Sequence, residues 1–135
     1  MEWKDWPRTR TASDLDCIEA GEGPPVALIH GVGLRADAWG GQIPVLADHY
    51  HVRAYDTPGR GGSRPVGEHP SLADYTDRFA EAIAAFGEPA LVAGHSMGAL
   101  IVLDLGIRYP ELVRGVAALN GVFRRSDEAK TAVRA

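Results

Sequence analysis

A turn at residues 94–98, with the sequence Gly-His-Ser-Met-Gly, constrains the fold of this chain more than any other segment. Residues 90–93 before it are apolar and predict a short buried strand. Residues 99–108 after it are apolar on nearly every face and predict a buried helix. A G-x-S-x-G turn between a strand and a helix is typical of a nucleophile elbow, which holds its serine in a strained backbone conformation beyond the strand end. The sequence therefore predicts that Ser96 is a nucleophile.

The two glycines of this turn have a steric explanation. A Cβ atom at Gly94 or Gly98 is expected to collide with the neighbouring strand or helix. The N-terminus of the predicted helix then directs its free N–H groups and the positive end of its dipole toward the reacting centre. The alternative is a surface serine in a glycine-rich turn, and the flanking strand and helix argue against such a chance match.

The rest of the chain alternates predicted strands and helices. Strands are expected at residues 8–11, 15–19, 26–29, 51–55, 90–93 and 113–119. A further helix is expected from a capping box at Ser71 to about Phe86, with Gly87 and Pro89 ending it. This alternation predicts an α/β fold with a mostly parallel sheet and helices on both faces.

Composition excludes several classes of partner and site. The net charge of −4 and the absence of a basic cluster argue against nucleic acid. No apolar run is long enough to span a bilayer, so no membrane partner is expected. The single cysteine, Cys17, excludes a disulfide framework and favours a cytoplasmic location, and we expect it to be half-buried in its strand. The spacing of Cys and His predicts no metal site.

The end of the chain predicts an incomplete domain. Ser126 has the features of a helix N-cap with acidic residues in the first turn, but the pattern stops at Ala135 without a C-cap. The strand at residues 113–119 would also form an apolar sheet edge with nothing to cover it. We therefore expect an N-terminal fragment of a longer protein.

Three motifs together resemble the α/β-hydrolase superfamily. They are H-G-V-G at residues 30–33, D-T-P-G-R-G-G-S at residues 56–63 and the turn at residues 94–98, in the family's order. The chain is most similar to the esterase, enol-lactonase and haloperoxidase-like branches, which carry a cap after the sixth strand. The resemblance implies the N-terminal portion of the α/β-hydrolase fold, with about six strands, in residues 1–122, and the start of a cap helix in residues 123–135.

The resemblance also implies a role for each motif. Ser96 would attack a carbonyl carbon and form an acyl-enzyme, while the backbone N–H groups of Val32 and Met97 would bind the oxyanion. The residues that would support the oxyanion loop and the elbow are His30, Gly31, Gly33, Gly94, His95 and Gly98. Candidates for a substrate pocket, or equally for core packing, are Leu34, Trp39 and Phe123. The implied activity is hydrolysis of a small-molecule carboxylic ester or lactone without a cofactor.

A complete catalytic triad is not expected in these 135 residues. The serine needs a base that is itself oriented by an acid, and in this fold the acid and the histidine follow the serine in the chain. No histidine follows His95, and Asn120 is uncharged where some members place the acid. We therefore expect the chain alone to be inactive.

Two other readings stay open. Residues 31–36 and Asp56 fit most of a dinucleotide-binding fingerprint, although Gly40, Gly41 and Pro44 would break the helix that it needs. The absent base and acid also suit a non-catalytic hydrolase scaffold that binds a ligand or partner. The sequence does not choose between an esterase, a lactonase, a C–C bond hydrolase and a haloperoxidase.

Overall fold

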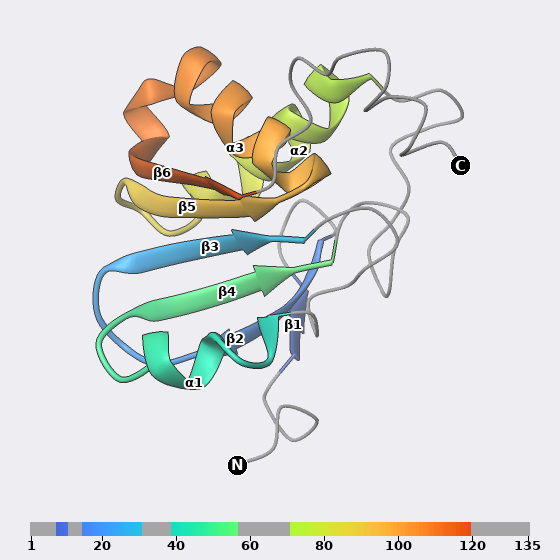
Figure 1. The fold of residues 1–135 in the computed structure, drawn as a ribbon. Coiled ribbons are helices and arrows are strands. Elements are labelled where there is room, and N and C mark those ends of the chain that lie inside the picture. The colour runs from blue at the N-terminus through green and yellow to red at the C-terminus, as the bar shows by residue number, and fades with distance from the viewer. Residues whose placement is uncertain (1–7, 11–14, 31–38, 57–70, 120–135) are drawn as a thin grey trace, which may run out of the picture.

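The computed structural model describes residues 8–10, 15–30, 39–56 and 71–119 (Figure 1). The strands in these ranges are β1 (Arg8–Arg10), β2 (Asp16–Ala20), β3 (Pro25–Ile29), β4 (His51–Tyr55), β5 (Ala90–His95) and β6 (Val113–Leu119). The helices are α1 (Ile43–Leu46), α2 (Leu72–Ala84) and α3 (Met97–Arg108), with a short 3₁₀ turn, η3 (Pro110–Leu112), before β6. The predicted strands and the two longer helices are confirmed, with bounds that differ by two residues at most.

The strands form one mostly parallel sheet in the order β1-β2-β4-β3-β5-β6. Strands β4, β3, β5 and β6 run parallel, whereas β1 and β2 form an antiparallel extension beside β4. Helix α1 covers one face of the sheet, and α2 and α3 cover the other (Figure 1). This arrangement is the α/β class that the sequence predicts.

The central strand β3 separates two hydrophobic cores. All five of its residues are buried, as expected for a parallel strand covered on both faces. Because successive side chains point to opposite faces, Ala27 and Ile29 lie with the helices α2 and α3, in what we name the α2–α3 core. Val26 and Leu28 lie with α1, in what we name the α1 core. The sheet is thus stabilised from both sides.

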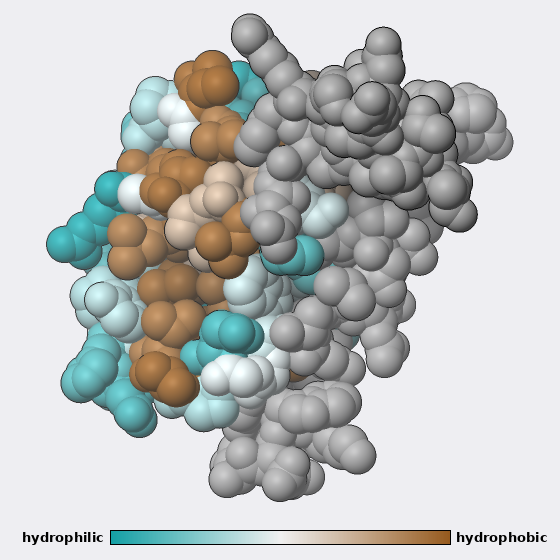
Figure 2. Space-filling view, in the orientation of Figure 1, coloured by the Kyte–Doolittle hydropathy of each residue, from teal (hydrophilic) through white to brown (hydrophobic). Residues whose placement is uncertain are grey.

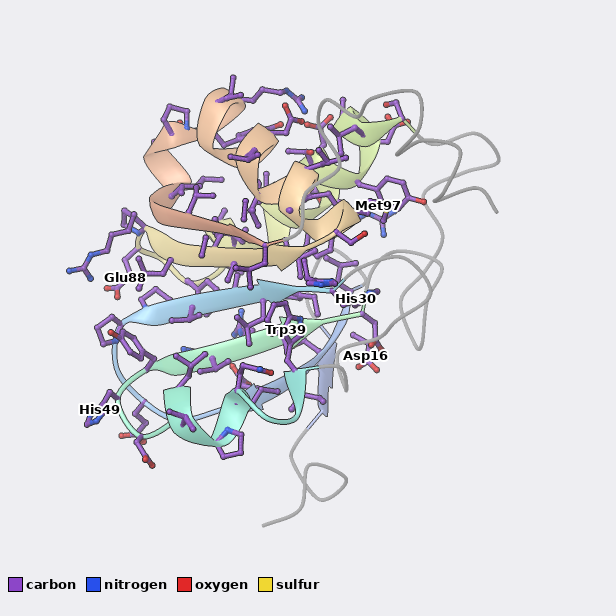
Figure 3. All side chains as sticks on the ribbon, viewed as in Figure 1. Asp16, His30, Trp39, His49, Glu88 and Met97 are labelled. Carbon is purple, nitrogen blue, oxygen red and sulfur yellow. The ribbon has the colours of Figure 1, made fainter. Side chains whose placement is uncertain are left out.

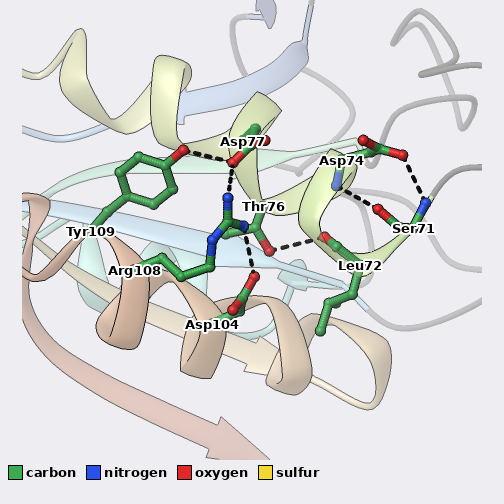
Figure 4. A network of polar contacts seen from close by, with 8 residues as sticks. All are labelled: Ser71, Leu72, Asp74, Thr76, Asp77, Asp104, Arg108 and Tyr109. Atoms are coloured by element: carbon green, nitrogen blue, oxygen red, sulfur yellow. Dashed lines mark hydrogen bonds and ion pairs between the residues drawn. The ribbon is translucent and has the colours of Figure 1, made fainter.

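Helix α2 begins with the predicted capping box (Figure 4). The backbone N–H of Asp74 donates to Ser71 Oγ at 3.2 Å, and the Ser71 N–H donates to Asp74 Oδ2 at 2.8 Å. Phe79 and Ile83 are buried in the α2–α3 core, but Leu72, at the first position of the helix, is exposed. The apolar face therefore begins one turn later than the sequence predicts.

Two predictions of burial need correction, and one short helix is not predicted from the sequence. Cys17 is fully buried rather than half-buried, because β2 is paired on both edges and this side chain lies in the α2–α3 core. Helix α3 is not covered all round by the described residues, since Ile107 is 78% exposed. Helix α1 is not predicted from the sequence. It begins after Gly40 and Gly41 and has Pro44 in its first turn. Proline is tolerated there because a backbone N–H in the first turn has no partner within the helix.

Strand β6 is an apolar edge of the sheet within the described part of the chain. Val116 and Leu119 are exposed on it, as the prediction of an uncovered edge requires. An open groove of about 350 Å³ continues from β6 across β5 and β3 on the α1 face. Figure 2 shows apolar side chains gathered on this side of the molecule. No helix among the described residues is long and apolar enough to cross a membrane.

A polar network ties the end of α3 to α2 (Figure 4). Asp77 Oδ1 accepts hydrogen bonds from Arg108 Nη2 and from the Tyr109 hydroxyl, each at 2.6 Å. Arg108 Nη1 also donates to Asp104 one turn earlier, at 3.0 Å. The Tyr109 hydroxyl, followed by Arg108, holds the pKa of Asp77 below its usual range.

This lowered pKa predicts an acid-dependent contribution to stability. A carboxyl group whose pKa is lower in the folded state than its unfolded value of about 3.9 stabilises the fold above that pH, and the contribution is lost as the pH falls through the folded value. Asp77→Asn should therefore lower the unfolding temperature near pH 6, and the deficit should shrink below about pH 4. Because these side chains are partly exposed, the effect should be small.

Thermal unfolding of the full-length protein between about pH 3 and 7 measures this difference, since that range brackets the titration of the carboxyl group. Glu81→Gln is a matched control because Glu81 is an exposed carboxylate on the same helix. A deficit for Asp77→Asn that stays constant over this range would contradict the assignment.

Candidate active site

Ser96 occupies the sharp turn between β5 and α3. Its backbone has φ 58° and ψ −114°, and it is the only non-glycine residue with positive φ among those that the structure describes. Such a conformation costs about 1–3 kcal/mol and persists only where the surrounding structure enforces it. The surrounding structure therefore holds Ser96 in a strained backbone conformation, although a relaxed turn would be more stable.

Two glycines make this turn possible. A Cβ atom on Gly94 would run into the backbone of Gly98, one turn along at the start of α3. A Cβ atom on Gly98 would run into the carbonyl oxygens of Ile29 and His30 at the end of β3. Because the obstacles are backbone atoms, they cannot move aside as a flexible side chain would. The first turn of α3 is thus seated directly against the end of β3.

Backbone hydrogen bonds fix Ser96 from two further directions. Its N–H donates to the carbonyl oxygen of Leu119 at the end of β6, at 2.9 Å, and its own carbonyl accepts from the Ala99 N–H at 3.0 Å. The sequence gives no sign of the part played by Leu119, because periodicity does not reveal which strands are neighbours.

The hydroxyl of Ser96 makes no capping bond to its helix. Serine is a favoured N-cap residue, and Ser71 caps α2 in the usual way. Ser96 holds the same N-cap position on α3, yet its side chain accepts no hydrogen bond from the first turn. Its φ of 58° is also unlike the extended backbone of Ser71. Ser96 therefore does not cap α3 in the way that Ser71 caps α2.

The order of the strands places Ser96 at a reversal point of the sheet. From β3, the chain passes to β4 on one side and later reaches β5 on the other. In open parallel sheets, a crevice forms beyond the carboxyl ends of the strands at such a point, and ligands bind there. Ile29 and Gly94 are in register, so His30 and Ser96 follow their strands at this same edge. Figure 3 shows His30 and Met97 at this end of the sheet.

The structure places the other predicted site residues as follows. His30 is buried beneath the edge, while His95 and Met97 are half-buried. Met97 packs against the α2–α3 core. Trp39 is 7% exposed and belongs to the α1 core, so its role in the described structure is core packing. The predicted positions that lie outside the described residues are Gly31, Val32, Gly33, Leu34 and Phe123.

The described residues contain no cluster of side chains for a metal ion. In ranges 15–30, 39–56 and 71–119, no three His, Cys, Asp or Glu side chains are placed to hold a metal ion together. Residues 31–36, which carry the glycine pattern of the dinucleotide-binding fingerprint, lie outside the described residues.

Comparison with known proteins decides the family. The sequence profile of the Alpha/beta hydrolase family matches residues 26–134, which include most of β3, all of β4 to β6 and the turn at Ser96. The chain belongs to the alpha/beta hydrolase family. Its sheet is the N-terminal portion of that family's fold.

Two curated alpha/beta hydrolase relatives show the range of reactions among similar proteins. The chain is 44% identical over 117 residues to an (E)-2-((N-methylformamido)methylene)succinate hydrolase of Acinetobacter baylyi, covering 86% of this chain and 44% of the relative. It is 36% identical over 107 residues to a pimeloyl-[acyl-carrier protein] methyl ester esterase of Methylococcus capsulatus, covering 78% of this chain and 40% of that protein.

Among solved alpha/beta hydrolase structures, an E-2-(acetamidomethylene)succinate hydrolase superposes with a TM-score of 0.86 at 28% identity. The superposition covers 94% of this chain and 49% of that structure. The chain therefore spans less than half the length of each of these three relatives.

Proposed function

We propose that the protein is a serine hydrolase that cleaves a carboxylic ester or lactone through an acyl-enzyme on Ser96. The observation that carries this proposal is the positive φ of Ser96, enforced by backbone contacts of Gly94 and Gly98. A protein that used this serine only for structure would gain stability from a relaxed turn. The family and the hydrolase relatives support the same reaction type.

In the proposed mechanism, Ser96 Oγ attacks the carbonyl carbon while a base accepts its proton. The carbonyl oxygen becomes an oxyanion that accepts hydrogen bonds from the backbone N–H groups of Met97 and Val32. Collapse breaks the bond to the leaving oxygen, which takes the proton from the base. Water then attacks the acyl-enzyme by the same route and releases the acid and Ser96. No histidine follows Ser96 in residues 1–135, so we assign neither the base nor its acid partner to these residues.

An amide is a second candidate substrate class. The names of two similar proteins include a formamido and an acetamido group, each attached through methylene to succinate. An amide would form the same acyl-enzyme at Ser96, with nitrogen in place of oxygen as the leaving atom. Turnover of matched methyl ester, lactone and N-methylformamide substrates by the full-length protein separates these classes.

Covalent labelling tests the nucleophile directly. A fluorophosphonate probe should phosphonylate Ser96 Oγ with loss of fluoride, and peptide mass spectrometry should place the adduct on the peptide that contains Ser96. Ser71→Ala should label like the parent protein, because Ser71 lies at the start of α2 and serves as its cap. Ser96→Ala should remain unlabelled.

An unlabelled full-length protein would favour the non-catalytic scaffold, and an adduct on another serine would overturn the assignment of Ser96. The turnover of the isolated chain of residues 1–135 should be measured beside that of the full-length protein. We propose that it shows negligible turnover, because activation by a base accelerates such reactions by about 10²–10⁴-fold.

A further inference from the structure

We draw no further inference here: the strongest candidate, the apolar groove that Val26, Leu28, Leu91 and Ala93 line on the α1 face of the sheet, carries no proposal because nothing in the structure shows what covers it.

Discussion

Ser96→Ala in the full-length protein should lower kcat by roughly 10⁴-fold or more and change the free energy of unfolding by less than about 1 kcal/mol. Activity falls because alanine has no atom to attack the carbonyl carbon. Stability is kept because alanine bears the same strain at φ 58° and because the serine side chain makes no capping bond. Steady-state kinetics and urea unfolding measure the two effects.

Ser71→Ala is the complementary control, since Ser71 is also an N-cap serine. It should lower the free energy of unfolding by about 1 kcal/mol, because it removes a hydrogen bond to the Asp74 N–H, and should leave kcat unchanged. Turnover retained by Ser96→Ala would show that another residue carries the chemistry.

Ser96→Gly should separate strain from chemistry. Glycine adopts positive φ without a steric penalty, so this variant should be more stable than Ser96→Ala by about 1 kcal/mol. It should be equally inactive, because it also lacks the hydroxyl. Chemical denaturation of the two variants side by side gives the difference. Equal stability, or a less stable glycine variant, would contradict the claim that the turn is strained.

Gly98→Ala should have the largest effect on the fold. The added Cβ meets the carbonyl oxygens of Ile29 and His30, which are backbone atoms held by the sheet. To relieve the clash, α3 must move away from β3, and Ser96 must move with it. We expect a loss of about 3 kcal/mol in the free energy of unfolding and a large loss of kcat, since overpacking against rigid neighbours is costly.

Gly106→Ala provides the matched control in the same helix. Its Cβ would approach only the Cγ2 atom of Val116, at 3.3 Å, and that side chain is exposed and can shift. Alanine also favours helix over glycine by about 1 kcal/mol, so stability should be unchanged or slightly higher. The proposed role of the contact between α3 and β3 in positioning Ser96 would be wrong if Gly98→Ala had the same free energy of unfolding and the same kcat as Gly106→Ala.

Local rules account for what could be predicted from the sequence. The strand and helix around Ser96 follow from short-range hydrophobic patterns, and the capping box at Ser71 follows from the spacing of two residues. The need for glycine at Gly94 and Gly98 follows from the geometry of the turn itself. Each of these features depends on residues that are close together in the chain.

Features that depend on tertiary neighbours could not be predicted in the same way. Cys17 is fully buried because β2 has a strand on each side, and the pattern of its own strand does not show this. Trp39 could line a pocket or fill a core on sequence grounds, and the position of α1 beside β4 determines which. Helix α1 is too short to produce a recognisable period.

The pairing of β3 with β5 also has a consequence for the order of folding. Val26 pairs with Val52 in β4 but also with Leu91 in β5, much farther along the chain. Closing the longer loop costs more entropy, so the β3–β5 contact should form after the more local pairings. Gly98 comes to pack against the backbone of Ile29 only when β3 and β5 pair. A chain that has not yet made this contact should therefore carry Ser96 in a relaxed turn, and the positive φ at Ser96 should arise only as β3 and β5 pair.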